Sequence, residues 1–362
     1  MEWLSLIILI PYLYHIIRIW KALSGIKAFR IGKSPCLFVS VIIACHNEEK
    51  YLPCLLADIS VQEYNQDLYE VIVVDDNSTD TTAETARSFK GINNLRVISN
   101  SGKGKKQAVS TGVEASAGSF AVTTDADCRV GSKWLKTIAS FAEEKHPVMT
   151  INPVVINAGR GFFNRFQELE FLSLQGITAG TAALGDPVMC NGANLGIAKE
   201  AWLRNAGRLH DELVSGEDVF LLHSLKSEDG PGILWLESAD AAAATRGSLN
   251  LISFLRQRGR WISKAGYYSD RYTRQLGIVT FVTILVQVLL FLCGFINPGF
   301  FTVFAVCTLL KSVPDFLILH NTTGRYGKRE LLRWFFPSQL VYPLYVISVL
   351  PFSFRGRSVW QG

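Results

Sequence analysis

The middle of the chain, residues 35–247, alternates short apolar runs with amphipathic segments. The segment 105–117, between the last two of these runs, has the pattern of a helix. This alternation predicts an α/β domain with a mostly parallel sheet, because strands buried on both faces appear as continuous apolar runs. The runs predicted as strands are 39–44, 71–74, 96–99 and 120–124.

An apolar stretch near the N-terminus is interpreted as a membrane anchor. Residues 3–17 are nearly all apolar, and the stretch ends at Arg18. A signal peptide would have a basic start and a small-residue cleavage site, and neither is present. We therefore predict a transmembrane helix over residues 1–20.

Three more apolar stretches, at 276–296, 300–319 and 332–352, follow the middle region. Each approaches the roughly 20 residues with which a helix crosses the hydrocarbon core. Together they predict a C-terminal transmembrane region over 276–352. The last stretch contains three prolines, and Arg355 follows it. Two interpretations stay open for this stretch: a full crossing, or a re-entrant or kinked segment.

Basic residues beside the apolar stretches predict their orientation. Loops rich in Lys and Arg face the cytoplasm. We therefore expect the N-terminus outside and the middle domain in the cytoplasm, at the inner membrane of the cell. The residues that carry this bias are Arg18, Lys21, Lys27, Arg30, Lys33, Arg325, Lys328, Arg329 and Arg333.

Lys311 and Asp315 lie four residues apart in the second C-terminal stretch, and hence on one helix face. Charges at membrane depth are costly and usually face protein or water. They are interpreted either as a self-neutralising structural pair or as a polar lining for a lipid headgroup or a sugar.

Charge and cysteine usage exclude several functional classes. The net charge of +5, from 36 Lys and Arg against 31 Asp and Glu, is too small to indicate nucleic-acid binding. The seven cysteines form no C-x-x-C pair. We therefore expect neither a disulfide framework nor a zinc site, and we expect a reducing compartment.

Acidic residues follow two of the predicted strands. Asp75 comes after the strand at 71–74, and Asp125 and Asp127 come after the strand at 120–124. Ligands of such sheets bind beyond the carboxyl ends of the strands. In D-x-D the two carboxylates would share one side of an extended backbone, where their repulsion favours bound Mg²⁺ or Mn²⁺. Mg²⁺ commonly binds one or two carboxylates plus substrate phosphates, which predicts a nucleoside diphosphate ligand.

Two further segments carry candidate chemistry. Lys105 lies in a glycine- and lysine-rich turn before the predicted helix, which suits phosphate binding, although the spacing is not that of a P-loop. A solvated basic loop is the alternative. Glu217 and Asp218 open a helix predicted over 218–226, either as helix caps or with a general base among them.

A basic amphipathic segment, 248–273, precedes the first C-terminal apolar stretch. It contains Gln257, Arg260 and Trp261 in the pattern Q-x-x-R-W. Such a segment is expected to lie at the membrane interface. Its Trp and Arg residues are either ordinary interfacial anchors or part of a site.

In this order, the motifs resemble the membrane-bound branch of the family 2 glycosyltransferases, which have a Rossmann-like GT-A fold. That branch includes synthases of cellulose, chitin, hyaluronan and poly-N-acetylglucosamine, and ceramide glucosyltransferase. The first motif has A-C-H-N where P-x-Y-N is commoner, but Asn47 and Glu48 are kept. The motifs are V-S-V-I-I-A-C-H-N-E-E from Val39, V-V-D-D-N-S-T-D from Val73, G-K from Gly104, T-D-A-D from Thr124, G-E-D from Gly216 and Q-x-x-R-W from Gln257.

For the donor, the resemblance implies a nucleoside diphosphate sugar, and we expect a UDP-sugar. Asp75 would contact its base or ribose, beside the loop with Asn47 and Glu48. Asp125 and Asp127 would hold donor and metal, with Asp127 as the direct ligand.

For the chemistry, the resemblance implies single displacement with inversion. Lys105 would neutralise phosphate, and Asp218 would be the catalytic base. Trp261 would stack on a sugar ring, and Cys190-Asn191-Gly192-Ala193 loosely matches a short acceptor-side motif. The residues on the side of the acceptor and diphosphate would be Glu217, Gln257, Arg260 and Trp261.

The resemblance leaves the product open, because Q-x-x-R-W occurs both in processive synthases and in enzymes that add one sugar. Four apolar segments are fewer than in synthases that form their own pore. This favours transfer to a lipid or lipid-linked glycan over processive synthesis of a β-linked polysaccharide such as poly-N-acetylglucosamine. A sugar-phosphate nucleotidyltransferase would need no membrane helices, and a catalytically silent membrane partner would not need every catalytic position filled.

Overall fold

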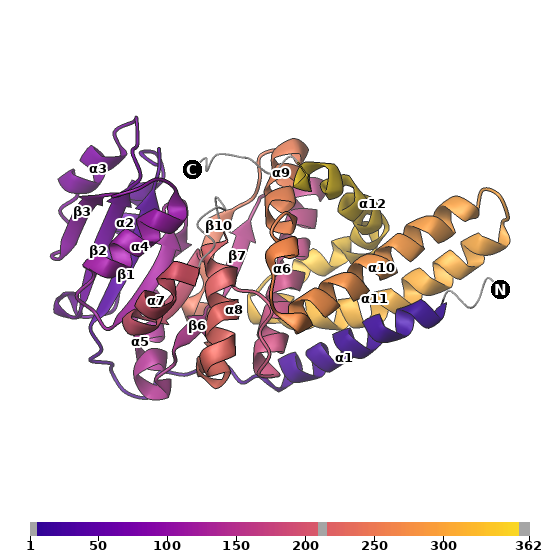
Figure 1. Ribbon diagram of the computed structural model, residues 1–362, viewed down its shortest axis with the longest axis horizontal. Coiled ribbons are helices and arrows are strands. Elements are labelled where there is room, and N and C mark those ends of the chain that lie inside the picture. The colour runs from indigo at the N-terminus through magenta and orange to yellow at the C-terminus, as the bar shows by residue number, and fades with distance from the viewer. Residues whose placement is uncertain (1–5, 209–215, 355–362) are drawn as a thin grey trace. The chain divides into compact units, whose positions relative to one another are not determined.

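The computed structural model describes residues 6–208 and 216–354, which form two compact units (Figure 1). The sheet unit consists of Lys27–Asn157 and Met189–Arg246. The helical unit consists of the described parts of Met1–Ile26, Ala158–Val188 and Gly247–Gly356. The sequence predicted a continuous domain over 35–247, whereas the structure groups Ala158–Val188 with the apolar helices.

The sheet unit is built on a seven-stranded sheet with the order β3-β2-β1-β4-β8-β6-β9. The first four strands in this order are parallel, as are β6 and β9, and β8 runs antiparallel to both β4 and β6. The predicted α/β class with a mostly parallel sheet is therefore confirmed. The strands are β1 (Val39–Cys45), β2 (Tyr69–Asp75), β3 (Leu95–Ser99), β4 (Phe120–Asp125), β6 (Met149–Ile151), β8 (Asn194–Ala198) and β9 (Ile233–Trp235).

A second, three-stranded sheet with the order β5-β10-β7 was not predicted. Its strands are short: β5 (Arg129–Val130), β7 (Val154–Asn157) and β10 (Ala243–Arg246). The α-helices of the sheet unit are α2 (Leu52–Ser60), α3 (Thr82–Ser88), α4 (Lys105–Ala115), α5 (Trp134–Lys145), α7 (Lys199–Asn205) and α8 (Glu217–Asp229). Short 3₁₀ turns complete it: η2 (Gln66–Leu68), η3 (Ala206–Arg208), η4 (Gly230–Gly232) and η5 (Ala239–Ala241).

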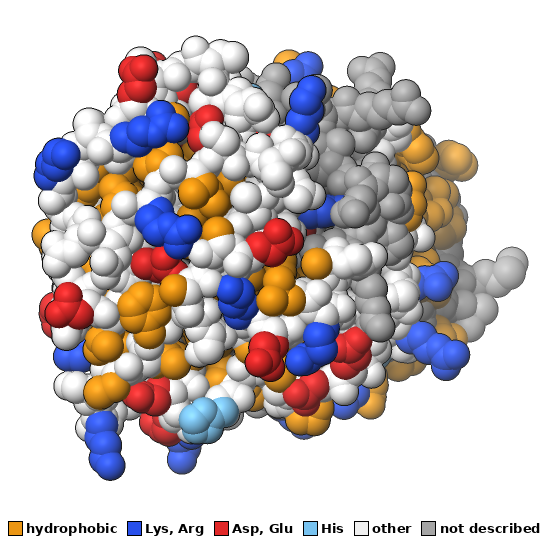
Figure 2. Space-filling model, turned by 60° about the vertical axis from the view of Figure 1, so that its left-hand side comes forward, with side chains coloured by type: hydrophobic (Ala, Val, Ile, Leu, Met, Phe, Trp, Pro, Cys, Tyr) orange, Lys and Arg blue, Asp and Glu red, His pale blue; other side chains and the backbone are white. Residues whose placement is uncertain are grey.

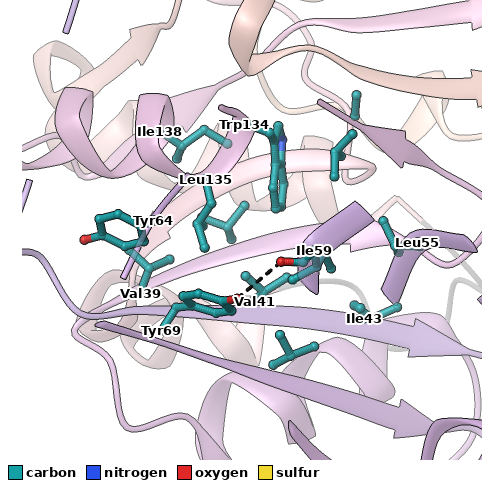
Figure 3. Packing of buried hydrophobic residues seen from close by; sticks show 14 of the residues in the cluster. Val39, Val41, Ile43, Leu55, Ile59, Tyr64, Tyr69, Trp134, Leu135 and Ile138 are labelled. Atoms are coloured by element: carbon teal, nitrogen blue, oxygen red, sulfur yellow. Dashed lines mark hydrogen bonds between the residues drawn. The ribbon is translucent and has the colours of Figure 1, made fainter. Parts of the chain in front are cut away.

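The core of the sheet unit forms around β1, in which every residue is buried. Figure 3 shows Val41 and Ile43 of this strand among side chains of the neighbouring helices, including the fully buried Trp134. Tyr69 donates from its hydroxyl to the carbonyl of Ile59 at 3.2 Å, the dashed line in Figure 3. Burial on both faces explains why this strand is a continuous apolar run in the sequence.

The face in Figure 2 carries acidic and basic side chains interspersed, and neither sign forms a continuous field. This agrees with the small net charge of +5. A surface of this kind provides no extended electrostatic footprint of one sign on the face shown.

The helical unit contains four helices that are long and apolar enough to cross a membrane: Leu6–Gly25, Arg271–Cys293, Gly299–Arg325 and Arg329–Ser353. The first extends five residues beyond the predicted end at residue 20, and residues 1–5 of the prediction lie outside the described range. The α-helices of the unit are α1 (Leu9–Gly25), α6 (Phe162–Ala183), α9 (Leu251–Ile262), α10 (Arg271–Cys293), α11 (Gly299–Arg325) and α12 (Phe335–Ser353), with 3₁₀ turns η6 (Ala265–Tyr267) and η7 (Arg329–Trp334).

The last apolar stretch is helical to Ser353 although Pro343 and Pro351 lie inside α12. Together with η7 it forms a span of 25 residues, which is long enough for a full crossing. Arg355 and Arg357, on which the alternative interpretation depended, lie outside the described residues.

Lys311, which is buried, and Asp315, which is partly buried, form an ion pair in α11, with 2.6 Å between the ammonium and the carboxylate. Tyr12 of α1 donates to the same carboxylate at 2.6 Å, and Gln339 of α12 donates to it at 3.3 Å. The pair therefore joins three helices, which supports the interpretation as a structural pair. Charges at this depth persist where protein groups surround them.

Two glycines of α6 allow close contact with neighbouring helices. A methyl group at Gly180 would lie 2.5 Å from Cγ2 and 2.7 Å from the carbonyl oxygen of Ile19 in α1. One at Gly176 would lie 2.5 Å from Cγ2 of Ile318 in α11. Small residues at such positions let helix backbones approach closely in membranes.

We expect Gly180→Ala to destabilise the protein by about 1–3 kcal/mol, because the added methyl group meets the α1 backbone. Thermal unfolding of the detergent-purified protein would show a lower Tm. The matched control is Gly277→Ala in α10, where a methyl group meets no atom within 4 Å. Equal melting temperatures of the two variants would contradict the packing argument.

Candidate active site

The parallel register places two aspartates on either side of the end of β1. Cys45 pairs with Asp75 of β2, and Ala44 pairs with Asp125 of β4. Neighbouring strands lie about 4.8 Å apart, so the two aspartates flank β1 on strands about 10 Å apart. The sequence prediction of an acidic edge at the strand ends agrees with this register.

Asp75 and Asp76, adjacent in sequence, have different environments. Asp75 Oδ1 is buried, and among the described residues nothing donates a hydrogen bond to it. The Asp76 carboxylate accepts from Asn100 at 2.6 Å and from the backbone N–H of Gly104 at 2.8 Å. Asp76 therefore fixes the turn before α4, in which Gly104 has a φ of +91°. Asp75 is the member of the pair with an oxygen left for a ligand.

The loop after β1 is bonded to the loop after β2 through Asn47, which has a left-handed φ of 58°. Its side-chain oxygen accepts from the N–H of Thr79 at 2.8 Å, and its own N–H donates to Ser78 at 3.0 Å. The backbone N–H of Glu48 donates to Thr82 at 2.7 Å. Asn47 thus holds the two loops together, a role that the sequence did not indicate.

The Glu48 side chain is buried near other carboxylates. Burial and the charges of Asp127, Asp125 and Asp80 raise its pKa to about 7, and Arg246 partly opposes this shift. An acidic group with a raised pKa among like charges indicates an edge at which negative charge is concentrated.

The two carboxylates of the D-x-D motif are brought together by a turn and not by an extended strand. β4 ends at Asp125, and Asp127 lies in the turn that follows. The expectation that both side chains share one side of an extended strand is therefore wrong. The turn nevertheless keeps the two carboxylates near each other, since burial and then the charge of Asp125 raise the pKa of Asp127. Thr245 of β10 donates to Asp127 at 3.3 Å.

Lys105, the first residue of α4, lies between the acidic groups. Its ammonium donates to Asp125 at 2.5 Å. Burial alone would lower the pKa of Lys105, but the charges of Asp125, Glu217 and Asp218 raise it above its ordinary value. The lysine therefore stays charged and couples the end of β4 to the start of α8.

Asp218 is held by backbone donors at the start of α8. One carboxylate oxygen accepts from the N–H of Gly192 at 2.9 Å, and the other from the N–H of Val219 at 2.8 Å. The carbonyl of Gly192 in turn accepts from the hydroxyl of Thr123 on β4 at 2.7 Å. Glu217 is buried beside it and accepts from the N–H of Gly216 at 2.9 Å. Asp218 is thereby positioned by β4 through a single loop.

One pocket brings Lys105 and Asp125 together with Glu217 and Asp218. Its charged lining comes from two elements that begin at the same edge, α4 and α8, and from the end of β4. The lining residues are Ala44, Lys105, Val109, Thr123, Thr124, Asp125, Gly192, Leu195, Trp202, Glu217 and Asp218. Three carboxylates, an ammonium group and apolar side chains in one pocket suit a ligand with both anionic and hydroxyl groups.

The remaining predicted residues belong to the helical unit. Gln257, Arg260 and Trp261 lie on α9, and all three are partly exposed. Burial lowers the pKa of Arg260 from its ordinary value. The predicted set therefore divides into eight residues of the sheet unit and three residues of α9.

Sequence reasoning missed several residues of this site. Arg246 of β10 stacks over the ring of Tyr51 at 4.3 Å and counters the raised pKa of Glu48. Trp202 lines the pocket from α7. Gly192 acts through its backbone N–H, and only the loose Cys190–Ala193 match pointed to it. The short strand β10 gave no signal in the sequence.

A divalent cation at this edge would take its protein ligands from Asp125 and Asp127. Among the described residues no group of three His, Cys, Asp or Glu side chains could hold a metal by itself. Asp125 and Asp127 fit the alternative in which Mg²⁺ or Mn²⁺ takes one or two carboxylates and completes its shell with phosphate and water. The orphaned oxygen of Asp75 lies at the same edge of the sheet.

Comparison with protein families gives two overlapping matches. Residues 121–347, more than half of the chain, match "Glycosyl transferase family group 2". Residues 40–201 match "Glycosyl transferase family 2". These ranges include most of the sheet unit and most of the apolar helices.

Among curated proteins, the chain is similar to the beta-monoglucosyldiacylglycerol synthase of Nostoc sp., with 28% identity over 237 residues, 64% of this chain and 49% of that protein. It is also similar to the poly(ribitol-phosphate) beta-N-acetylglucosaminyltransferase TarS of Staphylococcus aureus, with 34% identity over 127 residues, 34% of this chain and 22% of TarS. The matches span half of these relatives or less.

Among solved structures, the mannosyltransferase PcManGT from Pyrobaculum calidifontis, in complex with GDP-Man and Mn²⁺, has a TM-score of 0.61 and 16% identity. The similarity covers 99% of this chain and 100% of that one. At this identity the likeness shows the fold, and it confirms the expected GT-A class.

Proposed function

Because the chain belongs to the family 2 glycosyltransferases, we propose that it transfers a sugar from a nucleoside diphosphate sugar to a membrane-associated acceptor, with inversion. We expect a UDP-sugar as donor and a lipid or lipid-linked glycan as acceptor. The observation that carries this proposal is that Lys105 and Asp125 line the same pocket as Glu217 and Asp218.

On the donor side, the Asp75 carboxylate would accept a hydrogen bond from the base or ribose, beside the loop of Asn47 and Glu48. Asp125 and Asp127 would hold Mg²⁺ or Mn²⁺, with Asp127 as the direct ligand. The cation supplies charge stabilisation for a leaving diphosphate. Lys105, which stays protonated among these carboxylates, would neutralise phosphate from the side of α4.

On the acceptor side, Asp218 would act as general base. Its carboxylate would take the proton of an acceptor hydroxyl while that oxygen forms a bond to the anomeric carbon. The bond from this carbon to the diphosphate oxygen breaks on the opposite face, and the diphosphate leaves with the electron pair. Attack and departure on opposite faces give inversion. The bonds from Gly192 and Val219 fix the carboxylate while leaving lone pairs for the hydroxyl.

The membrane is proposed as the place of the acceptor. Four helices in the described part of the chain are long and apolar enough to cross it, and the relative from Nostoc is named for a glucosyldiacylglycerol product. We place the catalytic face in the cytoplasm, at the inner membrane, where nucleotide sugars are available. Gln257, Arg260 and Trp261 would contact the diphosphate and the acceptor from α9.

We expect Asp218→Asn to lower kcat by about 10³-fold or more, because the amide cannot accept the proton. Donor affinity, measured by equilibrium binding of the nucleotide sugar, should change less than about threefold. Asp229→Asn at the exposed far end of α8 is the matched control and should keep wild-type turnover. Retained turnover in Asp218→Asn would refute the base assignment.

Chelation should abolish transfer, and added Mn²⁺ or Mg²⁺ should restore it. Asp127→Asn is expected to raise the cation concentration for half-maximal activity by about tenfold or more, because a carboxylate ligand becomes an amide. Asp240→Asn, at an exposed turn of the same unit, serves as control. Full activity in EDTA would show that the transfer needs no divalent cation.

Product size separates single transfer from processive synthesis. With detergent-purified protein, nucleotide sugar and lipid extract, we expect a glycolipid that carries one added sugar. Mass spectrometry of the organic phase and size analysis of the aqueous phase would measure both products. High polymer formed without lipid would instead identify a polysaccharide synthase.

A further inference from the structure

Helix α9 buries the two positions that the pattern Q-x-x-R-W leaves unspecified. Arg258 is 2% exposed, and Gly259 is also buried. The specified residues Gln257, Arg260 and Trp261 are partly exposed. The residues available to a ligand are therefore attached to the helical unit through their buried neighbours.

Arg258 is bonded to a carboxylate of α6. Its Nε and Nη2 donate to the two oxygens of Glu170 at 3.0 and 2.6 Å. Tyr345 of α12 donates to Glu170 at 3.0 Å. Because both Glu170 oxygens are engaged and both charged side chains are buried, the guanidinium plane has one orientation.

The same guanidinium contacts two of the partly exposed residues. Its Nη1 donates to the side-chain oxygen of Gln257 at 2.7 Å. A guanidinium only donates, so the Gln257 oxygen faces Arg258 and the amide nitrogen points away from it. The guanidinium also lies over the ring of Trp261 at 4.1 Å. The Phe171 ring of α6 lies 6.3 Å from the same indole, so the cation and this ring together hold the orientation of Trp261.

Gly259 brings α9 onto α12. A methyl group there would lie 2.7 Å from Cβ and 2.8 Å from the carbonyl carbon of Phe352. Backbone contact at this distance fixes the position of α9 along the axis of α12. Arg258 and Gly259 therefore determine the rotation and the position of the helix that carries the motif.

We propose that Arg258, oriented by Glu170 and Tyr345, is a positioning residue that fixes the Gln257 amide and the Trp261 ring for the acceptor and diphosphate. Buried ion pairs contribute little net stability compared with apolar replacements, so stability alone does not explain the pair. A fixed guanidinium gives two flexible side chains one arrangement. This inference rests on the proposed function, because it assigns a role to residues of that site.

The test uses the detergent-purified full chain and acceptor kinetics. In Arg258→Lys the ammonium cannot bond both Glu170 oxygens and Gln257 while stacking on Trp261. In Glu170→Gln the guanidinium loses its charged partner. We expect both variants to raise the acceptor KM and lower kcat, with kcat/KM reduced about 10- to 100-fold, since small misplacements of positioning groups have effects of this size.

Glu168→Gln is the matched control. Glu168 lies two residues away on α6, is also buried, and pairs with Lys328 at 3.0 Å and Arg165 at 3.4 Å. It should lower Tm about as much as Glu170→Gln while keeping the acceptor kinetics of the wild type. If Glu168→Gln and Glu170→Gln impair the kinetics equally, the role of Arg258 is structural only and the inference is overturned.

A charge swap, Glu170→Arg with Arg258→Glu, gives a second readout. It restores an ion pair but places a carboxylate beside the Gln257 oxygen and the Trp261 ring. We expect the Tm of the double variant to return toward the wild-type value, while its acceptor KM stays as high as in the single variants. Recovery of both would contradict the inference.

Substitutions at Trp261 and Gln257 separate the role of Arg258 from the assignment of the site itself. If Trp261→Ala impairs transfer and Arg258→Lys behaves like Glu168→Gln, only the inference fails. If the wild type transfers no sugar, the proposed function is wrong. If Trp261→Ala and Gln257→Ala are fully active, the assignment of α9 residues to this site is wrong.

Discussion

The parallel register of β2, β1 and β4 is the constraint on which the site in the sheet unit depends. Parallel strands end at one edge of the sheet, so the residues that follow them must meet there. Cys45 pairs with Asp75, and Ala44 pairs with Asp125. A shift of one residue would turn the side chains of these strands to their opposite faces. The buried core of β1 prevents such a shift, because both of its faces are already packed.

This register brings several carboxylates together at one edge, and their surroundings are of two kinds. Some carboxylates are neutralised locally: Asp76 by backbone and amide donors, and Asp125 by Lys105. Others are buried near like charges, and burial together with these charges raises the pKa of Asp127 and brings the pKa of Glu48 to about 7. An edge with this remaining imbalance attracts cations and groups that carry them.

Much of this architecture was visible in the sequence. The continuous apolar runs predicted the four parallel strands, because burial on both faces leaves a simple pattern. The acidic strand ends followed from the same alternation. The D-x-D geometry was misjudged because β4 ends at Asp125, and a strand pattern does not show where its last hydrogen bond lies.

Other features left no local signal. Helix α6 buries polar residues such as Gln167 and Glu170 beside apolar ones, so its sequence lacks a clear amphipathic stripe. Glu170 is buried because Arg258 and Tyr345, distant in sequence, surround it. Gly192 contributes a backbone group, which every residue type except proline carries. Such roles depend on tertiary contacts and become visible only in three dimensions.

Helix α6 interrupts the sheet unit in the sequence, and this limits the fragments into which the protein can be divided. Strand β6 pairs with β8 and β9, and β7 pairs with β10, and all three partners follow α6 in the sequence. A fragment that ends at residue 157 would leave β6 and β7 with open edges, which are templates for aggregation. A fragment over 27–246 would include α6 without the helices it packs against. The sheet unit is therefore not an excisable module, and expression of this protein is best planned with the whole chain.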